Sequence, residues 1–125
     1  MNVVDSSAWL EYFAGGAHAG RFAAVIESPD DLLVPSIVVL EVTRRVMQQR
    51  GEDAALQAAA LLHQGEVVPL DSGLALAAAK LGLENKLPMA DSIIFATAQQ
   101  FDAMLWTMDA DFDGLPKVRY IAKQR

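Results

Sequence analysis

Residues 1–13 have the sequence MNVVDSSAWLEYF, which predicts a strand, a turn and a helix in that order. Residues 1–4 are short, apolar and prone to form a β-strand. Residues 5–7 are of the types that begin helices, and the apolar, aromatic run at 8–13 continues as a helix. Gly15 and Gly16 predict its end. An acidic residue, Asp5, is therefore expected just past the end of the first strand.

The same alternation continues along the rest of the chain. Further strands are expected at 32–34, 66–70, 103–107 and 118–121, and further helices at 21–27, 37–49, 52–64, 72–83 and 88–101. Strands that alternate with helices predict a parallel sheet covered on both faces. We therefore expect an α/β sandwich of about five strands, in one domain that spans residues 1–125 because the chain is too short for two ordinary domains.

Composition limits the class of protein. The chain is 53% hydrophobic and 21% charged, with no apolar run of the roughly 18 residues that a membrane span needs. The first residues show no secretory signal, so we expect a cytoplasmic protein with no membrane partner. The sequence has no cysteine, which excludes disulfides and thiolate metal sites.

The net charge of −6 is opposite to the basic surface that nucleic-acid-binding proteins usually carry. The negative net charge argues less strongly against nucleic-acid binding if the acids hold divalent cations, because the bound metal then contacts the phosphate in place of the carboxylates. Basic residues near the site would have to supply the remaining contacts to the phosphates. Arg44, Arg45 and Arg50 fall on one predicted helix, with Lys80 and Lys86 on or near another. They are candidates for steering a polyanion, although a solvated helix face explains each of them equally well.

Four acidic positions stand out by their surroundings. Asp5 follows the first expected strand, and Asp109 follows the fourth, with Asp111 two residues later. Ligands of open parallel sheets bind outside the carboxyl ends of the strands, so these acids face each other if the two strands are neighbours. Glu41 and Asp91 each interrupt an apolar helical stretch. Each acid alone has an ordinary explanation as a helix cap, a surface glutamate or a turn residue; the combined placement favours a site.

Several carboxylates close together need a positive charge nearby, because they repel one another. Two unit charges about 4 Å apart repel by roughly 4 kcal/mol at an effective dielectric of 20, and the sequence offers few basic partners. Mg²⁺ and Mn²⁺ prefer carboxylate and water oxygens, whereas the isolated His18 and His63 give no zinc pattern. We therefore expect Mg²⁺ or Mn²⁺ at this site. Ser6, Ser7 and Thr107 have hydroxyls that can orient carboxylates, although capping is the more ordinary role for Ser6.

At this point the sequence resembles the PIN-domain nucleases, and among them the VapC-type toxins of toxin–antitoxin pairs. The resemblance covers nearly the whole chain. Its motifs are VVDSS at 3–7, VLEV at 39–42, LPMADSII at 87–94 and LWTMDADF at 105–112. Their order and spacing together are quite specific.

The resemblance implies a fold, an activity and partners. The fold would be an α/β/α sandwich with sheet order 3-2-1-4-5, and the activity that of an endoribonuclease dependent on Mg²⁺ or Mn²⁺. A homodimer and a VapB-like antitoxin partner are also implied. The catalytic and metal-binding acids would then be Asp5, Glu41, Asp91 and Asp109, with Asp111, Ser7 and Thr107 in auxiliary roles.

Three alternatives stay open at this stage. One is a catalytically silent PIN-like module that binds metal or RNA, and another is a PIN nuclease that is not a toxin. A phosphatase of the haloacid dehalogenase type also places an aspartate after its first strand, but it needs a second aspartate two residues later, where this chain has Ser7.

Overall fold

A five-stranded sheet forms the centre of the molecule, for which a computed structural model describes residues 1–123. Its order is β3-β2-β1-β4-β5 and every neighbouring pair is parallel. The α/β class and the order 3-2-1-4-5 are therefore confirmed. The strands are β1 (Asn2–Val4), β2 (Leu32–Pro35), β3 (Glu66–Val68), β4 (Met104–Thr107) and β5 (Val118–Tyr120).

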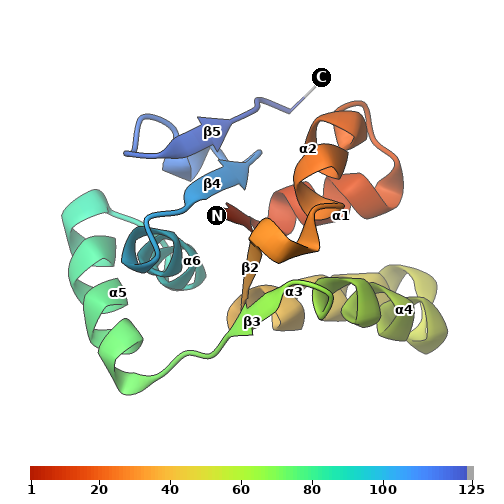
Figure 1. Cartoon of the computed structure of the whole chain (residues 1–125), viewed down its shortest axis with the longest axis horizontal. Helices are drawn as coiled ribbons and strands as arrows, with labels where there is room; N and C mark the ends of the chain where they lie inside the picture. Colours follow the sequence, from red (N-terminus) through yellow and green to blue (C-terminus); the bar gives the residue numbers. More distant parts are fainter. Residues whose placement is uncertain (124–125) are drawn as a thin grey trace.

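Helices cover both faces of the sheet. Figure 1 shows α5 and α6 on one side and α1 and α2 on the other, while α3 and α4 lie side by side near the β3 edge. The α-helices are α1 (Ser6–Ala14), α2 (Ala19–Ile26), α3 (Ser36–Arg50), α4 (Glu52–Leu62), α5 (Ser72–Asn85) and α6 (Met89–Gln100). Two short 3₁₀ helices, η1 (Pro29–Asp31) and η2 (Ala110–Phe112), complete the elements. Every element expected from the sequence is present, with ends that differ by a few residues.

Two glycines fix how the helices end and pack. Gly15 has φ of +64°, a left-handed conformation that ends α1. Gly82 on α5 faces Ser92 on α6, and a Cβ atom at Gly82 would overlap the Ser92 hydroxyl. The absence of a side chain at Gly82 therefore lets these two helices approach closely.

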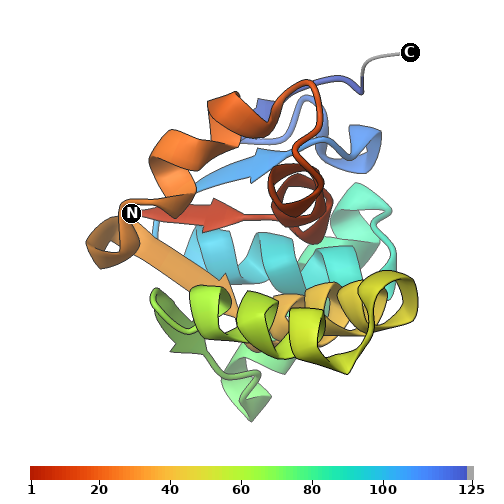
Figure 2. The ribbon, with the colours of Figure 1, turned by 90° about the vertical axis from the view of Figure 1, so that its right-hand side faces the viewer.

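The core lies between the sheet and the helices on each face. Its largest fully buried side chains are Trp9 on α1, Phe22 on α2, Phe95 on α6 and Phe112 on η2. Figure 2 shows β1, β2 and β4 running in the same direction. Their carboxyl ends therefore meet at one edge of the sheet, and this shared edge positions the site. Within residues 1–123, no helix is both long and apolar enough to cross a membrane.

Candidate metal centre

Asp5 forms the buried floor of the site. It follows β1 directly, its side chain is 3% exposed, and its backbone N–H donates to the Trp106 carbonyl on β4 at 2.9 Å. Although Asp5 occupies the position before α1, its carboxylate makes no helix-capping hydrogen bond. Burial raises the pKa of Asp5, hydrogen bonds from Ser7 and Thr107 oppose that rise, and the charge of Asp109 adds to it. The ordinary explanation of Asp5 as a cap is therefore wrong.

Two hydroxyls hold the Asp5 carboxylate. Ser7 Oγ donates to Asp5 Oδ2 at 2.7 Å, and Thr107 Oγ1 donates to the same oxygen at 2.8 Å. Thr107 Oγ1 also accepts from the backbone N–H of Asp109 at 2.9 Å, and Ser7 Oγ accepts from that of Met108 at 3.1 Å. The neighbouring strands β1 and β4 bring these groups together, because Val4 pairs with Trp106. One hydroxyl network thus links Asp5 to the turn that carries Asp109.

Glu41 reaches the site from α3. Its side chain is half-buried, and Glu41 Oε1 accepts from Ser6 Oγ at 2.7 Å. Ser6 was expected to cap α1, but its hydroxyl instead orients this glutamate. The bond joins residues 35 positions apart, so no local pattern in the sequence could have shown it.

Asp91 lies in the first turn of α6, and its pKa is affected by all the other acids of the cluster. Its pKa is raised to about 7, first by burial and then by the charges of four other carboxylates. In order of size these are Asp5, Asp109, Asp111 and Glu41. All five acids therefore lie within electrostatic reach of one another, although they come from four separate segments of the chain.

The tightest group is Asp91, Asp109 and Asp111. Each offers one carboxylate oxygen, and these three oxygens lie within 4.8 Å of one another. Asp109 is half-buried and accepts from the Asp111 backbone N–H at 2.9 Å, whereas Asp111 is exposed. The resemblance implied only an auxiliary role for Asp111, but one of its carboxylate oxygens lies within 4.8 Å of an oxygen of Asp91 and of an oxygen of Asp109. Asp5 and Glu41 are not members of this trio, but their charges also act on Asp91, and that of Asp5 has the largest effect of the four.

The donor set fits a hard divalent cation. In the part of the chain that the structure describes, the ion pairs are Lys80 with Glu84 and Lys117 with Asp102, and neither involves the five acids. Their charges are thus not offset by a basic side chain in contact. Five carboxylates with hydroxyl support and no cysteine match the oxygen ligands that Mg²⁺ and Mn²⁺ prefer. Such a cation would offset the repulsion among the carboxylates, which adds to burial in raising the pKa of Asp91.

A family model for the PIN domain matches residues 3–118. The chain belongs to the PIN domain family. This match runs from β1 into β5 and includes all five acids, so the acidic edge of the sheet lies wholly inside the PIN domain. No curated protein sequence matches the chain.

Solved structures of toxin–antitoxin proteins share this PIN fold. A toxin–antitoxin complex from Klebsiella pneumoniae is 26% identical, with a TM-score of 0.80 over 95% of this chain and 96% of that chain. Mycobacterium tuberculosis VapC20, described as a toxin that cleaves the sarcin-ricin loop, is 23% identical with a TM-score of 0.77, covering 94% of this chain and 97% of its own. VapBC2 from Rickettsia felis, bound to a promoter DNA fragment, is 13% identical with a TM-score of 0.72, covering 97% of each. The resemblance to VapC-type PIN proteins is thereby confirmed, and VapC-type members of the family are nucleases.

The Thr107 hydroxyl contacts the acidic cluster by hydrogen bonds to Asp5 and Asp109. Replacing Thr107 with Val tests whether these hydrogen bonds contribute to metal binding. Valine keeps the shape of the fully buried side chain but removes the hydroxyl that binds both Asp5 and the Asp109 N–H. We expect Mn²⁺ affinity to fall about 10- to 100-fold, the usual effect of losing a group that orients metal ligands. Isothermal titration with Mn²⁺ measures it. Thr107→Ser is the control, because it keeps the hydroxyl; equal Mn²⁺ affinity in Thr107→Val and wild type would show that the network does not serve a metal.

Without metal, the stability of the PIN domain should fall as pH rises. The pKa of Asp91 is raised from 3.8 to about 7, so the folded state keeps a proton that the unfolded state has already lost. This contribution is complete below the unfolded pKa and is lost as pH rises through about 7; Asp5 acts in the same direction. In EDTA, we expect the melting temperature to drop by several degrees between pH 5 and pH 8, and Asp91→Asn to flatten the drop. A profile in EDTA that does not differ between wild type and Asp91→Asn would contradict the cluster's electrostatics.

Proposed function

We propose that this PIN-domain protein is an endoribonuclease that depends on Mg²⁺ or Mn²⁺ and acts as the toxin of a toxin–antitoxin pair. The observation that carries the proposal is the convergence of acids near the carboxyl ends of the central strands, where oxygens of Asp91, Asp109 and Asp111 lie within 4.8 Å of one another. After burial, the charges of the other four acids all contribute to the raised pKa of Asp91. The toxin–antitoxin structures of the same fold support the biological role. We also propose that residues 1–125 form a single nuclease domain, located in the cytoplasm.

The acids have distinct proposed tasks. Asp91, Asp109 and Asp111 would hold the cation, because their oxygens lie within 4.8 Å of one another. Asp5 would complete the site from the floor, where Ser7 and Thr107 fix its direction. When bound, the cation supplies a polarised water and an offset for the charge that develops on the phosphodiester oxygens.

Glu41 has the most open role of the five. The Ser6 hydroxyl fixes one of its carboxylate oxygens, Oε1, at 2.7 Å. Glu41 can therefore act either as a further ligand or as the group that accepts a proton from the attacking water. Both roles require the deprotonated carboxylate, so both predict that Glu41→Gln loses activity, while only loss of a ligand also weakens metal binding.

The test of the proposal is cleavage of a pool of total cellular RNA by purified protein with Mn²⁺, Mg²⁺ or EDTA. Cleavage with metal and none in EDTA would support it, and the fragments would identify the RNA species that is cut. A protein that binds Mn²⁺ but cuts no RNA under any condition would instead favour the silent PIN-like module. Growth arrest on expression, relieved by an antitoxin protein, would separate a toxin from a PIN nuclease with another role.

We propose that the protein is a homodimer joined through α5 and α6. Leu83 and Met89 are 85% and 84% exposed, and they border an apolar groove lined in part by Ala78 and Gly82. Protruding apolar side chains beside an apolar groove can fit a second copy related by a two-fold axis, as a self-complementary interface requires. Light scattering should then give twice the chain mass of 13.5 kDa, and Leu83→Glu should give a monomer. A monomeric wild type would exclude this interface.

A further inference from the structure

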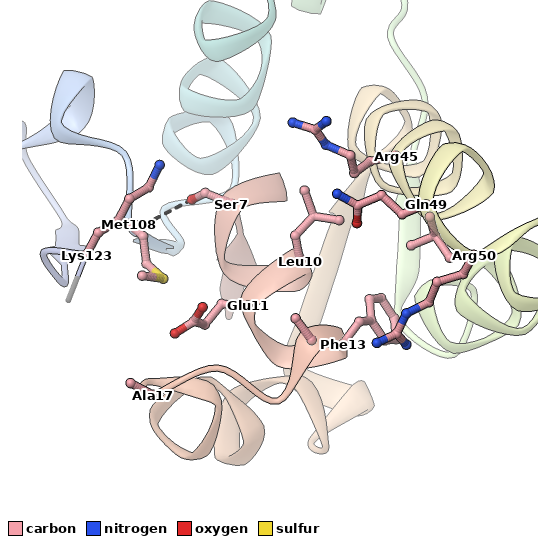
Figure 3. A pocket seen from close by; sticks show the side chains of 12 residues that line it. Ser7, Leu10, Glu11, Phe13, Ala17, Arg45, Gln49, Arg50, Met108 and Lys123 are labelled. Carbon is pink, nitrogen blue, oxygen red and sulfur yellow. Dashed lines mark hydrogen bonds between the residues drawn. The ribbon is translucent and has the colours of Figure 1, made fainter. Parts of the chain in front are cut away.

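A groove of about 650 Å³ lies between α1 and α3, next to the candidate metal centre (Figure 3). Ser7 and Met108 line the end of the groove nearest the acids, and Ser7 is the residue whose hydroxyl holds Asp5. Arg45 and Arg50 on α3 line its other wall. The groove therefore borders the proposed catalytic site through Ser7, while the five acids themselves lie outside its lining.

The groove is lined by several basic side chains although the protein as a whole is acidic. Arg45, Arg50 and Lys123 all line it, although the net charge of the protein is −6. Within residues 1–123, none of the three has a carboxylate within 4.0 Å, whereas Lys80 and Lys117 are paired. The one acid of the lining, Glu11, accepts from the His18 backbone N–H at 2.9 Å. Figure 3 shows it pointing away from the two arginines, so their charge is available to an anion.

The register of α3 places these cations at a definite spacing from the site. Arg45 follows Glu41 by four residues, so the two side chains lie on the same face of the helix with about 5–6 Å between their Cβ atoms. Such a separation is close to that of neighbouring phosphates in an extended nucleic acid strand. Arg44 points to a different side, is exposed and does not line the groove. From the sequence, Arg44 and Arg45 had the same candidate role, whereas in the structure only Arg45 of the two lines the groove.

The apolar part of the groove suits nucleobases. Leu10 and Phe13 lie along its α1 wall, and Arg50 lines the same groove from α3. Aromatic and apolar side chains stack on bases of any sequence, while cations along the same groove follow the phosphates. Charged and apolar side chains therefore occur together in a groove that borders the acidic site at Ser7.

We propose that this groove binds the single-stranded RNA segment next to the cleaved bond, with Arg45 contacting the phosphate adjacent to the scissile one and Arg50 a phosphate further along. The inference rests on the proposed ribonuclease function and adds positioning residues to it. Arg45 acts on the chemistry only by fixing the strand, so its loss should weaken RNA binding more than it lowers the rate at saturating RNA.

The experiment measures binding of a fluorescent single-stranded RNA 12-mer in the inactive Asp5→Asn background, across a salt series. One lost phosphate contact lowers the slope of log K against log salt by about 0.7, which is about fivefold in affinity at 0.1 M salt. We expect that loss for Arg45→Gln and about 25-fold for Arg45→Gln with Arg50→Gln. Arg44→Gln, the matched control, should bind like its parent, and Arg45→Lys should restore most of the slope. Glutamine is a good helix former and these side chains are exposed, so the fold should survive.

Three outcomes would overturn different claims. Equal affinities and salt slopes for Arg45→Gln and Arg44→Gln would overturn the RNA path and leave the groove to a protein segment. Absence of RNA cleavage by wild-type protein with every metal would overturn the proposed function itself. In the active background, Arg45→Gln should raise KM with little change in kcat; a fall in kcat alone would also contradict a positioning role.

Discussion

Asp5→Asn should lower metal-dependent RNA cleavage by about a thousandfold or more while leaving the fold intact. The expected loss reflects several kcal/mol of charge stabilisation that a correctly held cation supplies, at about 1.4 kcal/mol for each tenfold change in rate. Asparagine keeps the size of aspartate and one carbonyl oxygen, so the hydroxyls of Ser7 and Thr107 keep an acceptor. The negative charge at the floor of the site is what disappears.

The same substitution should not destabilise the metal-free protein. Burial raises the pKa of Asp5, which means that the charged carboxylate is costly where it stands. A neutral amide removes that cost, so we expect the melting temperature in EDTA to stay equal or to rise. Both properties are measured on one preparation, by cleavage of cellular RNA and by thermal melting.

The matched control for Asp5→Asn is Asp30→Asn, the same chemical change at an exposed position on η1. It should cleave RNA as the wild type does. If Asp5→Asn keeps activity within tenfold of wild type, Asp5 is not part of the catalytic site. If it loses activity only because it unfolds, the melting temperature will show it.

Mn²⁺ should raise the melting temperature of the wild-type protein by about 10 °C at a hundredfold excess over its dissociation constant. A ligand that binds only the folded state at that excess stabilises it by about 2.7 kcal/mol, and a domain of this size melts roughly 3–5 °C higher for each kcal/mol. The gain has a specific source here: burial and the charges of four other acids raise the pKa of Asp91, and a bound cation would offset the cost of keeping these carboxylates charged.

Three variants make the Mn²⁺ experiment specific. Asp91→Asn and Asp109→Asn each remove one member of the closest oxygen trio, so each should lose most of the shift, whereas Asp30→Asn should keep it. A melting temperature that Mn²⁺ does not change would argue against the metal centre, and with it against the proposed nuclease. A full shift in Asp91→Asn would place the cation elsewhere.

The sequence alone predicted the fold class and picked out the acids that the structure brings near one another. Strand-forming stretches alternate with helical stretches, which predicts a parallel sheet. All strands of a parallel sheet have their carboxyl ends on the same side, so Asp5 and Asp109, which follow two of these strands, lie on that side. Caps and glycines fixed the helices locally; Gly15 is one case. These features depend on neighbours along the chain, which is why they could be predicted.

Contacts between distant segments could be determined only by the tertiary structure. Nothing near Ser6 in the sequence distinguishes a helix cap from a hydrogen bond to Glu41, because the choice depends on where α3 packs against α1. The closeness of Asp111 to Asp91 depends on how the turn after β4 meets α6. The difference between Arg44 and Arg45 follows from which side of α3 lines the groove. Residue types and their order specify which groups are available, whereas distances, burial and charge coupling arise from the packing of elements far apart in the chain.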